Sequence, residues 1–333
     1  MRRNALFLVV VFFSLALIGC MGYAVKEVKR QEGSHQIFSE KGPEPAVYFC
    51  KKDNCSRHLE EAIVAAQSSV HCAFYDLDLP NVIAALGEQS SIIEVRVVLD
   101  DEPYEGALSG DGVVVEDRPS RMHNKFCIID GMYVWTGSFN PTENDNDLND
   151  NNAVLMSSVY LSKSYEEEFS ELWKGEFSGG EEVPYPSFHH NEVLIENAFC
   201  PEDYCEEKVA REISRAKNSV YVMVFSFTSE KIGDALLFNP EIEVRGVFDS
   251  SQAGSKYSQF KRLEGFGIPV KKDKGKGKLH HKVFIIDNLT VITGSYNPTA
   301  SGSENNDENI LIMHDEGIAR LYAEEFFRLW KAS

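Results

Sequence analysis

The sequence predicts an α/β protein built from two similar lobes related by pseudo-twofold symmetry, each a mixed sheet flanked by helices. Two observations predict this fold. The pattern H-x-K-x4-D-x6-G-S-x-N occurs twice, beginning at His123 and at His280, so the copies lie 280 − 123 = 157 residues apart. The elements expected around each copy also recur in the same order. We therefore divide the chain into a first lobe, residues 46–185, and a second lobe, residues 186–333, joined by a glycine- and proline-rich segment.

Five elements are expected before each motif, in the order strand, helix, strand, helix, strand. Apolar residues recur at helical spacing in the helices, and β-branched and aromatic residues fill the strands. In the first half these elements lie around residues 46–49, 59–66, 70–75, 82–86 and 95–100. In the second half they lie around residues 193–199, 209–216, 220–227, 232–236 and 244–249. The third strands end at Asp100 and Asp249, which we expect to cap the following turns.

Each motif supplies two more strands, and each lobe then closes with a strand and a helix. The apolar run after each motif lysine is typical of a buried strand. The second motif strand ends at Gly137 or Gly294, where glycine permits close approach of a ligand. After a polar loop, a strand is expected at 153–156 and at 310–313. The closing helices share an apolar face, made of Tyr165, Phe169, Leu172 and Trp173 and their counterparts Tyr322, Phe326, Leu329 and Trp330.

The residue types of the motif indicate chemistry on phosphorus. Histidine can act as nucleophile, general acid or general base near neutral pH. Lysine supplies a positive charge for a phosphate oxygen, and serine and asparagine add neutral hydrogen bonds. Because the histidine and the lysine are two residues apart at the start of a strand, they point to the same face.

This pair of motifs resembles the signature of the phospholipase D superfamily, and the resemblance covers nearly all of the chain after residue 45. It implies one composite active site at the lobe interface and a phosphodiesterase that forms a phosphohistidine without a metal or other cofactor. The catalytic residues that it implies are His123, Lys125, Asn140, His280, Lys282 and Asn297. We expect Asp130 and Asp287 to fix the structure of the motif, and Ser138 and Ser295 to assist.

The two halves differ at one position that the family uses. Members commonly carry an acidic residue after G-S-x-N. The second half has Glu308 at this position, whereas the first half has Asn151, an amide. In two-lobed members this acid pairs with the histidine of the other lobe, which implies a pair of Glu308 and His123. A carboxylate raises the basicity of an imidazole more than an amide does. We predict that His123 is the nucleophile and His280 the general acid and base, unless Asp150 moves into the place of Asn151.

Charge bears on the substrate. The chain has 33 basic and 52 acidic residues and a net charge of −19, so its surface as a whole is a poor binder of polyanions. A polyanionic substrate therefore needs a local basic patch. Basic residues are concentrated directly before each motif, and we predict that they form a basic rim at the mouth of the site: Arg118, Arg121, Lys271, Lys272, Lys274, Lys276 and Lys278.

Three functions compete. The lobes are compact, about 150 residues each, and they lack the long insertion that a lipid-binding lid needs. This compactness resembles the small nuclease branch of the family, in which two single-motif chains pair, and the lysines suit a nucleic acid. Phospholipase D or phosphatidyltransferase activity on membrane lipids is the alternative, and a non-catalytic phosphate-binding surface protein is the third. We expect a nuclease that works as a monomer, because both motifs lie in one chain.

The first 25 residues are predicted to be a signal peptide or membrane anchor. Arg2 and Arg3 precede an uncharged stretch, residues 4–25, that is long enough to span a bilayer. The segment Leu-Ile-Gly-Cys before and at Cys20 resembles a lipobox, in which Cys20 becomes lipidated. Residues 26–45 are polar and are expected to be a linker. The sequence therefore predicts an extracytoplasmic protein, anchored to the membrane or secreted.

The seven cysteines support the same compartment. Cys50 and Cys55 share a C-x4-C spacing with Cys200 and Cys205 at the matching place in the second half. Two short-range disulfides are expected, with reduced thiols or a shared four-cysteine metal site as the alternatives. The remaining pair outside the leader, Cys72 and Cys127, lies in apolar strand-like runs and is expected to be two buried free thiols.

Overall fold

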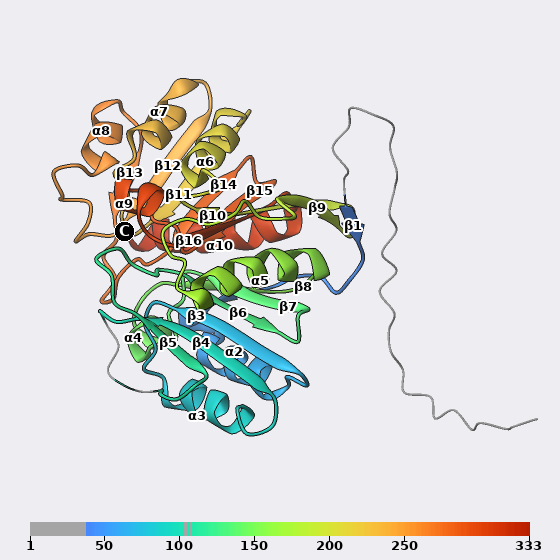
Figure 1. The fold of residues 1–333 in the computed structure, drawn as a ribbon. Coiled ribbons are helices and arrows are strands. Elements are labelled where there is room, and N and C mark those ends of the chain that lie inside the picture. The colour runs from blue at the N-terminus through green and yellow to red at the C-terminus, as the bar shows by residue number, and fades with distance from the viewer. Residues whose placement is uncertain (1–37, 103–105, 107) are drawn as a thin grey trace, which may run out of the picture.

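A computed structural model of the chain describes residues 38–102, 106 and 108–333. Two sheets, one in each lobe, face each other across a central layer that contains the helices α5 (Val159–Lys174) and α10 (Glu316–Ala332) (Figure 1). The predicted leader, residues 1–25 with Cys20, lies outside the described residues. Within the part of the chain that is described, no helix has the length and apolarity needed to cross a membrane.

The sheet of the first lobe has seven strands in the order β2-β8-β7-β6-β3-β4-β5. It is mixed, because β3 pairs in parallel with β4 and antiparallel with β6. Its strands are β2 (Ala46–Phe49), β3 (Ser69–Phe74), β4 (Glu94–Asp100), β5 (Val113–Glu116), β6 (Lys125–Ile129), β7 (Tyr133–Gly137) and β8 (Asn152–Ser157). The motif strands β6 and β7 thus lie near the middle of the sheet.

The sheet of the second lobe has nine strands in the order β1-β9-β10-β16-β15-β14-β11-β12-β13. From β10 onward this order repeats that of the first sheet, strand for strand, which confirms the two similar mixed lobes. Its strands are β1 (Phe38–Glu40), β9 (Ser187–His190), β10 (Val193–Cys200), β11 (Ser219–Val224), β12 (Glu243–Phe248), β13 (Val270–Lys272), β14 (Lys282–Ile286), β15 (Thr290–Gly294) and β16 (Glu308–Met313). Strand β1 pairs in parallel with β9, so residues 38–40 of the expected linker, residues 26–45, belong to the second sheet.

The helices form the outer and central layers. The helices α2 and α3 pack against the first sheet in one apolar core, and α6, α7 and α8 pack against the second sheet in another. Side-chain caps begin several helices; Ser158 accepts from the backbone N–H of Leu161 at the start of α5. The remaining helices are α1 (Cys50–Asp53), α2 (Cys55–Val64), α3 (Pro80–Gln89), α4 (Glu143–Asp147), α6 (Cys205–Ser214), α7 (Glu230–Phe238), α8 (Gln259–Gly265) and α9 (Ala300–Glu304).

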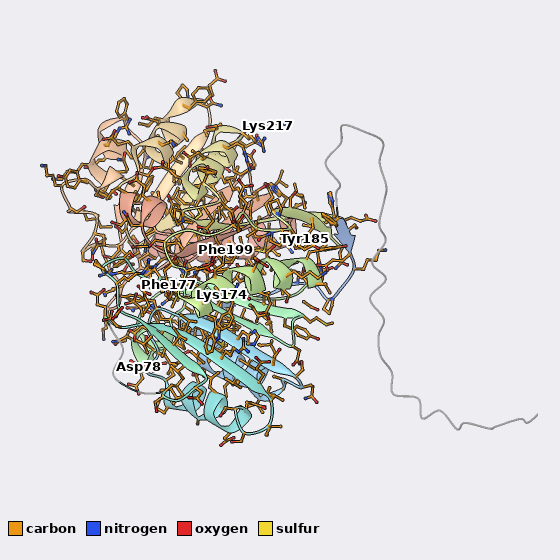
Figure 2. The ribbon with its side chains drawn as sticks, viewed as in Figure 1. Asp78, Lys174, Phe177, Tyr185, Phe199 and Lys217 are labelled. Atoms are coloured by element: carbon orange, nitrogen blue, oxygen red, sulfur yellow. A yellow bond between two sulfur atoms is a disulfide. The ribbon has the colours of Figure 1, made fainter. Side chains whose placement is uncertain are left out.

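The lobes share a third apolar core between the two sheets. The predicted aromatic faces of α5 and α10 lie in it, where Tyr165, Phe169, Tyr322 and Phe326 are all buried. Phe199 of the second sheet, at the junction of the lobes in Figure 2, has its ring centroid 4.9 Å from that of Tyr165. A shared core of this kind holds the two sheets together as rigidly as the interior of one domain.

The glycines at the ends of β7 and β15 are explained by packing between strands. Gly137 and Gly294 both have φ near +140°, at 145° and 141°. A Cβ atom at either would collide with a backbone oxygen of the neighbouring strand, that of Asn152 or Asn309. We expected these glycines to allow a ligand to approach closely. The structure shows instead that they allow the backbone of the neighbouring strand to do so.

Cysteine pairing is in part as expected. The disulfides Cys50–Cys55 and Cys200–Cys205 form, which confirms both predicted pairs. The expectation of free thiols at Cys72 and Cys127 is wrong, because these two residues form a third disulfide. They lie opposite each other on the antiparallel strands β3 and β6, with Cα atoms 4.0 Å apart. This register was not deducible from two separate apolar runs.

Candidate active site

The two motif histidines lie where the chain of one lobe hydrogen-bonds to the backbone of the other. The N–H of His123 donates to the backbone oxygen of Asp307 at 2.9 Å, and the N–H of His280 donates to that of Asp150 at 2.9 Å. The predicted turn caps also act here. Asp100 accepts from the backbone N–H of Glu102 and also from Met122, directly before His123. The strand ends therefore position each histidine at the interface.

Both histidines line one cavity of about 1110 Å³ between the lobes. Asn140 and Asn297 line it as well, so both copies of the motif contribute to a single site. The composite site at the lobe interface is confirmed in this respect. Most of the lining is polar, and it includes four aspartates in addition to basic residues: Asp76, Asp78, Asp145 and Asp249.

His123 pairs with the acidic residue of the opposite lobe. Its Nδ1 lies 2.8 Å from Oε2 of Glu308, which is fully buried. Burial, with the nearby Lys125 ammonium, lowers the pKa of His123 well below its ordinary value. Burial also raises the pKa of Glu308 to about 7. When Glu308 is ionised, Nδ1 is the donor of this bond, and the lone pair of Nε2 is left for a reacting atom.

His280 has two partners, and sequence reasoning found only one of them. Nδ1 of His280 lies 2.9 Å from Oδ1 of Asn151 and 3.4 Å from Oδ2 of Asp145. Burial lowers the pKa of His280 to about 4, with Lys282 acting in the same direction and Asp145 opposing it. Asp150, which was expected to be able to replace Asn151, instead pairs with Lys51 and Arg328, and none of the three lines the cavity.

Asp145 gives His280 a carboxylate neighbour in addition to the amide of Asn151. Burial alone would raise the pKa of Asp145, but His280, with hydrogen bonds from Asn149 and Asn140, holds that pKa well below its ordinary value. The counterpart of Asp145 at an offset of 157 is Gly302, since 145 + 157 = 302. Each histidine therefore has one carboxylate near Nδ1, taken from a different position in each lobe.

The motif lysines and asparagines supply polar groups to the same region. Nζ of Lys125 donates to the backbone oxygen of His123 at 2.6 Å, and Nζ of Lys282 to that of His280 at 2.8 Å. An ammonium has three N–H donors, so each lysine retains capacity for a phosphate oxygen. Burial lowers the pKa of Lys125 to about 8. Oδ1 of Asn140 and of Asn297 is buried without a hydrogen-bond partner among the described residues.

The supporting residues hold the motif in place. Asp130 accepts from the backbone N–H groups of residues 67–69 at 2.7 to 3.2 Å, and Asp287 does the same for residues 217–219 at 2.6 to 2.9 Å. Neither aspartate lines the cavity. The hydroxyl of Ser138 donates to Oδ1 of Asn151, and that of Ser295 accepts from the N–H of Asn309. Ser138 therefore positions Asn151, the partner of His280, and Ser295 holds the backbone next to Glu308, the partner of His123.

The structure brings only part of the predicted basic rim to the cavity. Arg121, Lys276 and Lys278 line it. The other predicted rim residues lie elsewhere. Lys271 donates to the backbone oxygen of Trp330, Lys272 lies over the ring of Phe260 and Lys274 donates to the chain terminus at Ser333, whereas Arg118 pairs with Glu116. For these four the prediction of a place at the mouth is wrong. Strand β13 turns Lys271 toward α10 and Lys272 toward α8, and Lys274 and Arg118 are held by Ser333 and Glu116.

Two aromatic side chains of the cavity were not singled out from the sequence. Tyr75 and Phe225 occupy matching places after β3 and β11, and their rings lie 4.9 Å from that of His123 and 5.0 Å from that of His280. Each ring also lies close to a motif lysine: Nζ of Lys125 is 5.1 Å from the ring centroid of Tyr75, and Nζ of Lys282 is 5.3 Å from that of Phe225. In the sequence, only their position directly after matching strands could have identified them as site residues.

We expect Asp145→Asn to lower turnover about 10- to 100-fold for alkoxide leaving groups, because it removes the charge that stabilises protonated His280. The loss should be much smaller for p-nitrophenolate, which departs without a proton. Steady-state rates with the two leaving groups measure this, with Asp147→Asn on the same short helix as the control. Equal losses for both leaving groups would contradict a role for Asp145 in protonation.

Comparison with known proteins agrees with this geometry. The family model described as "Cardiolipin synthase, PLD-like domain" matches residues 59–173 and 209–330. A mitochondrial cardiolipin hydrolase of Canis lupus familiaris is 38% identical over 126 residues, 37% of this chain and 50% of the relative, so the match spans only half of that protein. A phospholipase D of Rickettsia felis is 34% identical over 135 residues, 40% of this chain and 67% of the relative.

A likeness in fold extends over both lobes. The crystal structure of a phosphatidylserine synthase of Haemophilus influenzae has a TM-score of 0.66 and covers 86% of each chain at 9% identity, which shows a shared fold. The family model matches more than half of the chain, once in each lobe. With two motif copies facing one cavity, the protein belongs to the phospholipase D superfamily.

Proposed function

We propose that the protein is a phosphodiesterase that works through a phosphohistidine without a catalytic metal, and that its substrate is a nucleic acid. The single observation that carries the chemistry is the pair of histidines from opposite lobes in one cavity, each with Nδ1 facing an acceptor oxygen. Two such groups can act on opposite sides of one phosphorus, as an in-line displacement requires.

In the first step, Nε2 of His123 attacks phosphorus and a P–N bond forms as the bond to the leaving oxygen breaks. The proton on Nδ1 stays with the imidazole, held by Glu308. Protonated His280 gives its Nε2 proton to the departing alkoxide. A phosphodiester adds negative charge to the cavity, and this charge, with Asp145, favours the protonated form of His280.

In the second step, neutral His280 accepts a proton from water, and the oxygen of that water attacks phosphorus. The P–N bond breaks and its electron pair returns to His123, which restores the free enzyme. Lys125 and Lys282, with Asn140 in support, stabilise the charge on the non-bridging oxygens throughout.

The assignment of His123 as nucleophile follows from the two different carboxylates. The pKa of Glu308 is raised to about 7 by burial, whereas that of Asp145 is held low, so Asp145 carries a full negative charge beside His280. A permanent anion favours an imidazolium, which a general acid needs. Burial lowers the pKa of both histidines, but at His280 the charge of Asp145 opposes this lowering, so His280 is the better proton donor and His123 the better neutral nucleophile.

A nucleic acid is favoured as the substrate by the lining of the cavity. Tyr75 and Phe225 place aromatic rings beside the two histidines, where bases can stack. Arg121, Lys276 and Lys278 line the same cavity and can contact backbone phosphates. The lining offers few aliphatic side chains on which an acyl chain could pack.

A phospholipid is the second candidate, and a different observation favours it. The relatives at 34–38% identity are named cardiolipin hydrolase and phospholipase D. A membrane anchor in residues 1–25 would also keep the cavity close to a lipid surface. The same two histidines would then act on the phosphodiester of a headgroup.

The experiment that tests the proposal gives the purified protein plasmid DNA, cardiolipin vesicles and bis(p-nitrophenyl) phosphate in parallel. Cleavage of DNA, lost in His123→Asn, is the expected result. Cleavage of the lipid without cleavage of DNA would overturn the nuclease proposal and leave the chemistry standing. Turnover of none of the three would indicate a protein that only binds phosphate groups.

We expect hydrolysis at temperatures well below the unfolding transition to persist in excess EDTA, because two histidines and two lysines replace a metal-bound hydroxide. Rates with and without EDTA on bis(p-nitrophenyl) phosphate measure this, with a zinc-dependent phosphodiesterase as the positive control for chelation. A loss of activity that Mg²⁺ or Zn²⁺ restores, without any loss of folded protein, would contradict the mechanism.

We further propose that the protein acts outside the cytoplasm as an anchored or secreted monomer. Three disulfides support an oxidising compartment. Alkylation without reductant, applied to protein from its native membrane, should therefore label at most Cys20, and should label nothing if Cys20 is lipidated. Intact mass measures the number of labels. Labelling of Cys50 or Cys200 would contradict an oxidising compartment.

A further inference from the structure

The two short disulfides lie in turns that share one sequence pattern and one geometry. Each turn reads F-C-x2-D-x-C, at residues 49–55 in the first lobe (the first turn) and at residues 199–205 in the second lobe (the second turn). Asp53 and Asp203 each accept a hydrogen bond from the N–H of the phenylalanine of their own turn, at 2.8 and 2.9 Å. The phenylalanine of the second turn, Phe199, is labelled in Figure 2. The repeat therefore maintains the whole turn and not only its cysteines.

The residue before the second cysteine of each turn has an unusual backbone conformation. Asn54 has a φ of 56° and Tyr204 a φ of 57°, both in the left-handed region. Asparagine enters this region readily, but an aromatic residue does so only where its surroundings impose it. The aspartate hydrogen bond and the disulfide are two restraints that hold each turn in this form.

Each turn contacts the residue that orients a catalytic histidine. In the first lobe, the N–H of Cys50 donates to the backbone oxygen of Asn151 at 3.0 Å. In the second lobe, Cys200 lies opposite Glu308 in the antiparallel pair of β10 and β16. Both turns thus support, from behind, the residue whose side-chain oxygen faces Nδ1 of a histidine from the opposite lobe.

The surroundings of the first turn leave room for movement if the turn opens. Its two cysteines are buried, and a cavity of about 210 Å³ is lined by Phe49 and Cys50 together with Asn151. Asn151 holds Nδ1 of His280 at 2.9 Å. Opening of the turn would therefore let Asn151 move away from the histidine that it orients.

Global stability is a weak reason for two disulfides of this kind. A disulfide stabilises a protein mainly by closing a loop in the unfolded chain, and the effect grows with the length of that loop. The two short disulfides each join residues only 5 apart, whereas Cys72–Cys127 joins residues 55 apart. The long-range disulfide therefore contributes most to the free energy of unfolding, and the two short ones act locally.

We propose that the two disulfide-closed turns position the catalytic histidines, and that each turn acts on one of them. The first turn acts through Asn151 on His280, and the second turn acts through Glu308 on His123. The lining of the cavity includes no residue of either turn, so both act through these partners and not on the substrate. The proposal rests on the roles proposed above for the two histidines.

Removing the disulfide of the first turn should have an effect that depends on the leaving group. Single-turnover rates, measured with enzyme in excess, report the first step alone. Cys50→Ala with Cys55→Ala should lower this rate about 10-fold for a dialkyl phosphodiester, because a loosened Asn151 orients His280 less well for proton transfer. The rate for bis(p-nitrophenyl) phosphate should change little, because p-nitrophenolate departs without a proton.

Removing the disulfide of the second turn should slow the first step for both substrates alike. Cys200→Ala with Cys205→Ala should lower both single-turnover rates about 10-fold, since Glu308 acts on the nucleophile and every leaving group needs its attack. The matched control replaces both cysteines of the third disulfide, Cys72–Cys127, by alanine. This control should lower Tm the most and should keep the ratio of the two rates that the unmodified protein shows.

Equal losses for both substrates in the first-turn variant would overturn the proposal, as would unchanged rates in either turn variant. Rate losses that follow Tm across the three variants would also overturn it, because stability alone would then explain them. If a cysteine variant does not fold, Asp53→Ala or Asp203→Ala takes its place, since each loosens the same turn with its disulfide intact. The same dependence on the leaving group is then expected, and unchanged rates are contradictory.

The design separates this proposal from the others. Both substrates are synthetic diesters, so the outcome does not depend on whether the natural substrate is a nucleic acid. Mapping of the phosphoryl adduct in otherwise unmodified turns tests the roles of His123 and His280 separately. Failure of the positioning proposal is therefore distinguishable from failure of the proposed mechanism.

Discussion

Replacing His123 by asparagine is expected to lower turnover by about 10⁴-fold or more for every phosphodiester, whatever its leaving group. The reason is that His123 supplies the nitrogen that bonds to phosphorus, and asparagine has no comparable lone pair. The fold should be unaffected, because an asparagine amide can still donate toward Glu308. Steady-state rates on bis(p-nitrophenyl) phosphate and on a dialkyl phosphodiester measure the loss.

The control for this variant is His58→Asn, a histidine on α2 that stacks on Tyr48 and does not line the cavity. It should keep full activity. If His123→Asn retained more than about one hundredth of the rate with both substrates, nucleophilic attack by His123 would be contradicted, since loss of an auxiliary proton donor alone costs about 10²- to 10⁴-fold.

The second large effect concerns His280→Asn and depends on the leaving group. With an alkoxide leaving group, turnover should fall about 10³- to 10⁴-fold, because no group then protonates the departing oxygen. With p-nitrophenolate, the first step should persist and the second should be slow, because His280 also activates water. A burst of p-nitrophenolate of one equivalent per enzyme, followed by slow turnover, is the expected time course.

Stopped-flow absorbance measures this burst directly. Asp145→Asn should show a weaker form of the same behaviour, because Asp145 acts through His280. Loss of the burst in His280→Asn, with the burst intact in His123→Asn, would reverse the two roles. The composite cavity would remain as the site of the chemistry.

Much of the site was predictable because the motif occurs twice. An offset of 157 residues that maintains every motif residue in register requires two equivalent lobes, and equivalent lobes with one reactive group each suggest a shared site. The pair of His123 and Glu308 was expected from the family resemblance, and it forms across the lobes at 2.8 Å. The structural roles of Asp130 and Asp287 were expected from their place after the apolar run.

The residues that sequence reasoning missed depend on how loops fold. Asp145 lies in a short polar helix between the motif and β8, and its counterpart is Gly302, so the repeat itself gave no indication of its role. The pairing of Cys72 with Cys127 depends on the register of β3 against β6. The predicted basic rim failed in part because β13 forms in the lysine segment and directs Lys271 toward α10.

The buried glutamates of α5 illustrate a further limit of sequence reasoning. Glu168 and Glu171 had the spacing of two residues on one helical turn, which is common on solvated helix faces. Their burial and the approach of Glu202 from the other lobe became visible only when the lobes were placed together. Comparison of the repeats by structure then showed that arginine in one copy is replaced by glutamate in the other.

The central claim is that a covalent phosphoryl group forms on His123. The most direct measurement is peptide mapping by mass spectrometry of His280→Asn enzyme, mixed with bis(p-nitrophenyl) phosphate and quenched without acid, because phosphohistidine is acid-labile. The expected result is one adduct, on the peptide that contains His123, and none in the variant that also carries His123→Asn. An adduct on another residue, or no adduct while p-nitrophenolate is released in a burst, would contradict the claim.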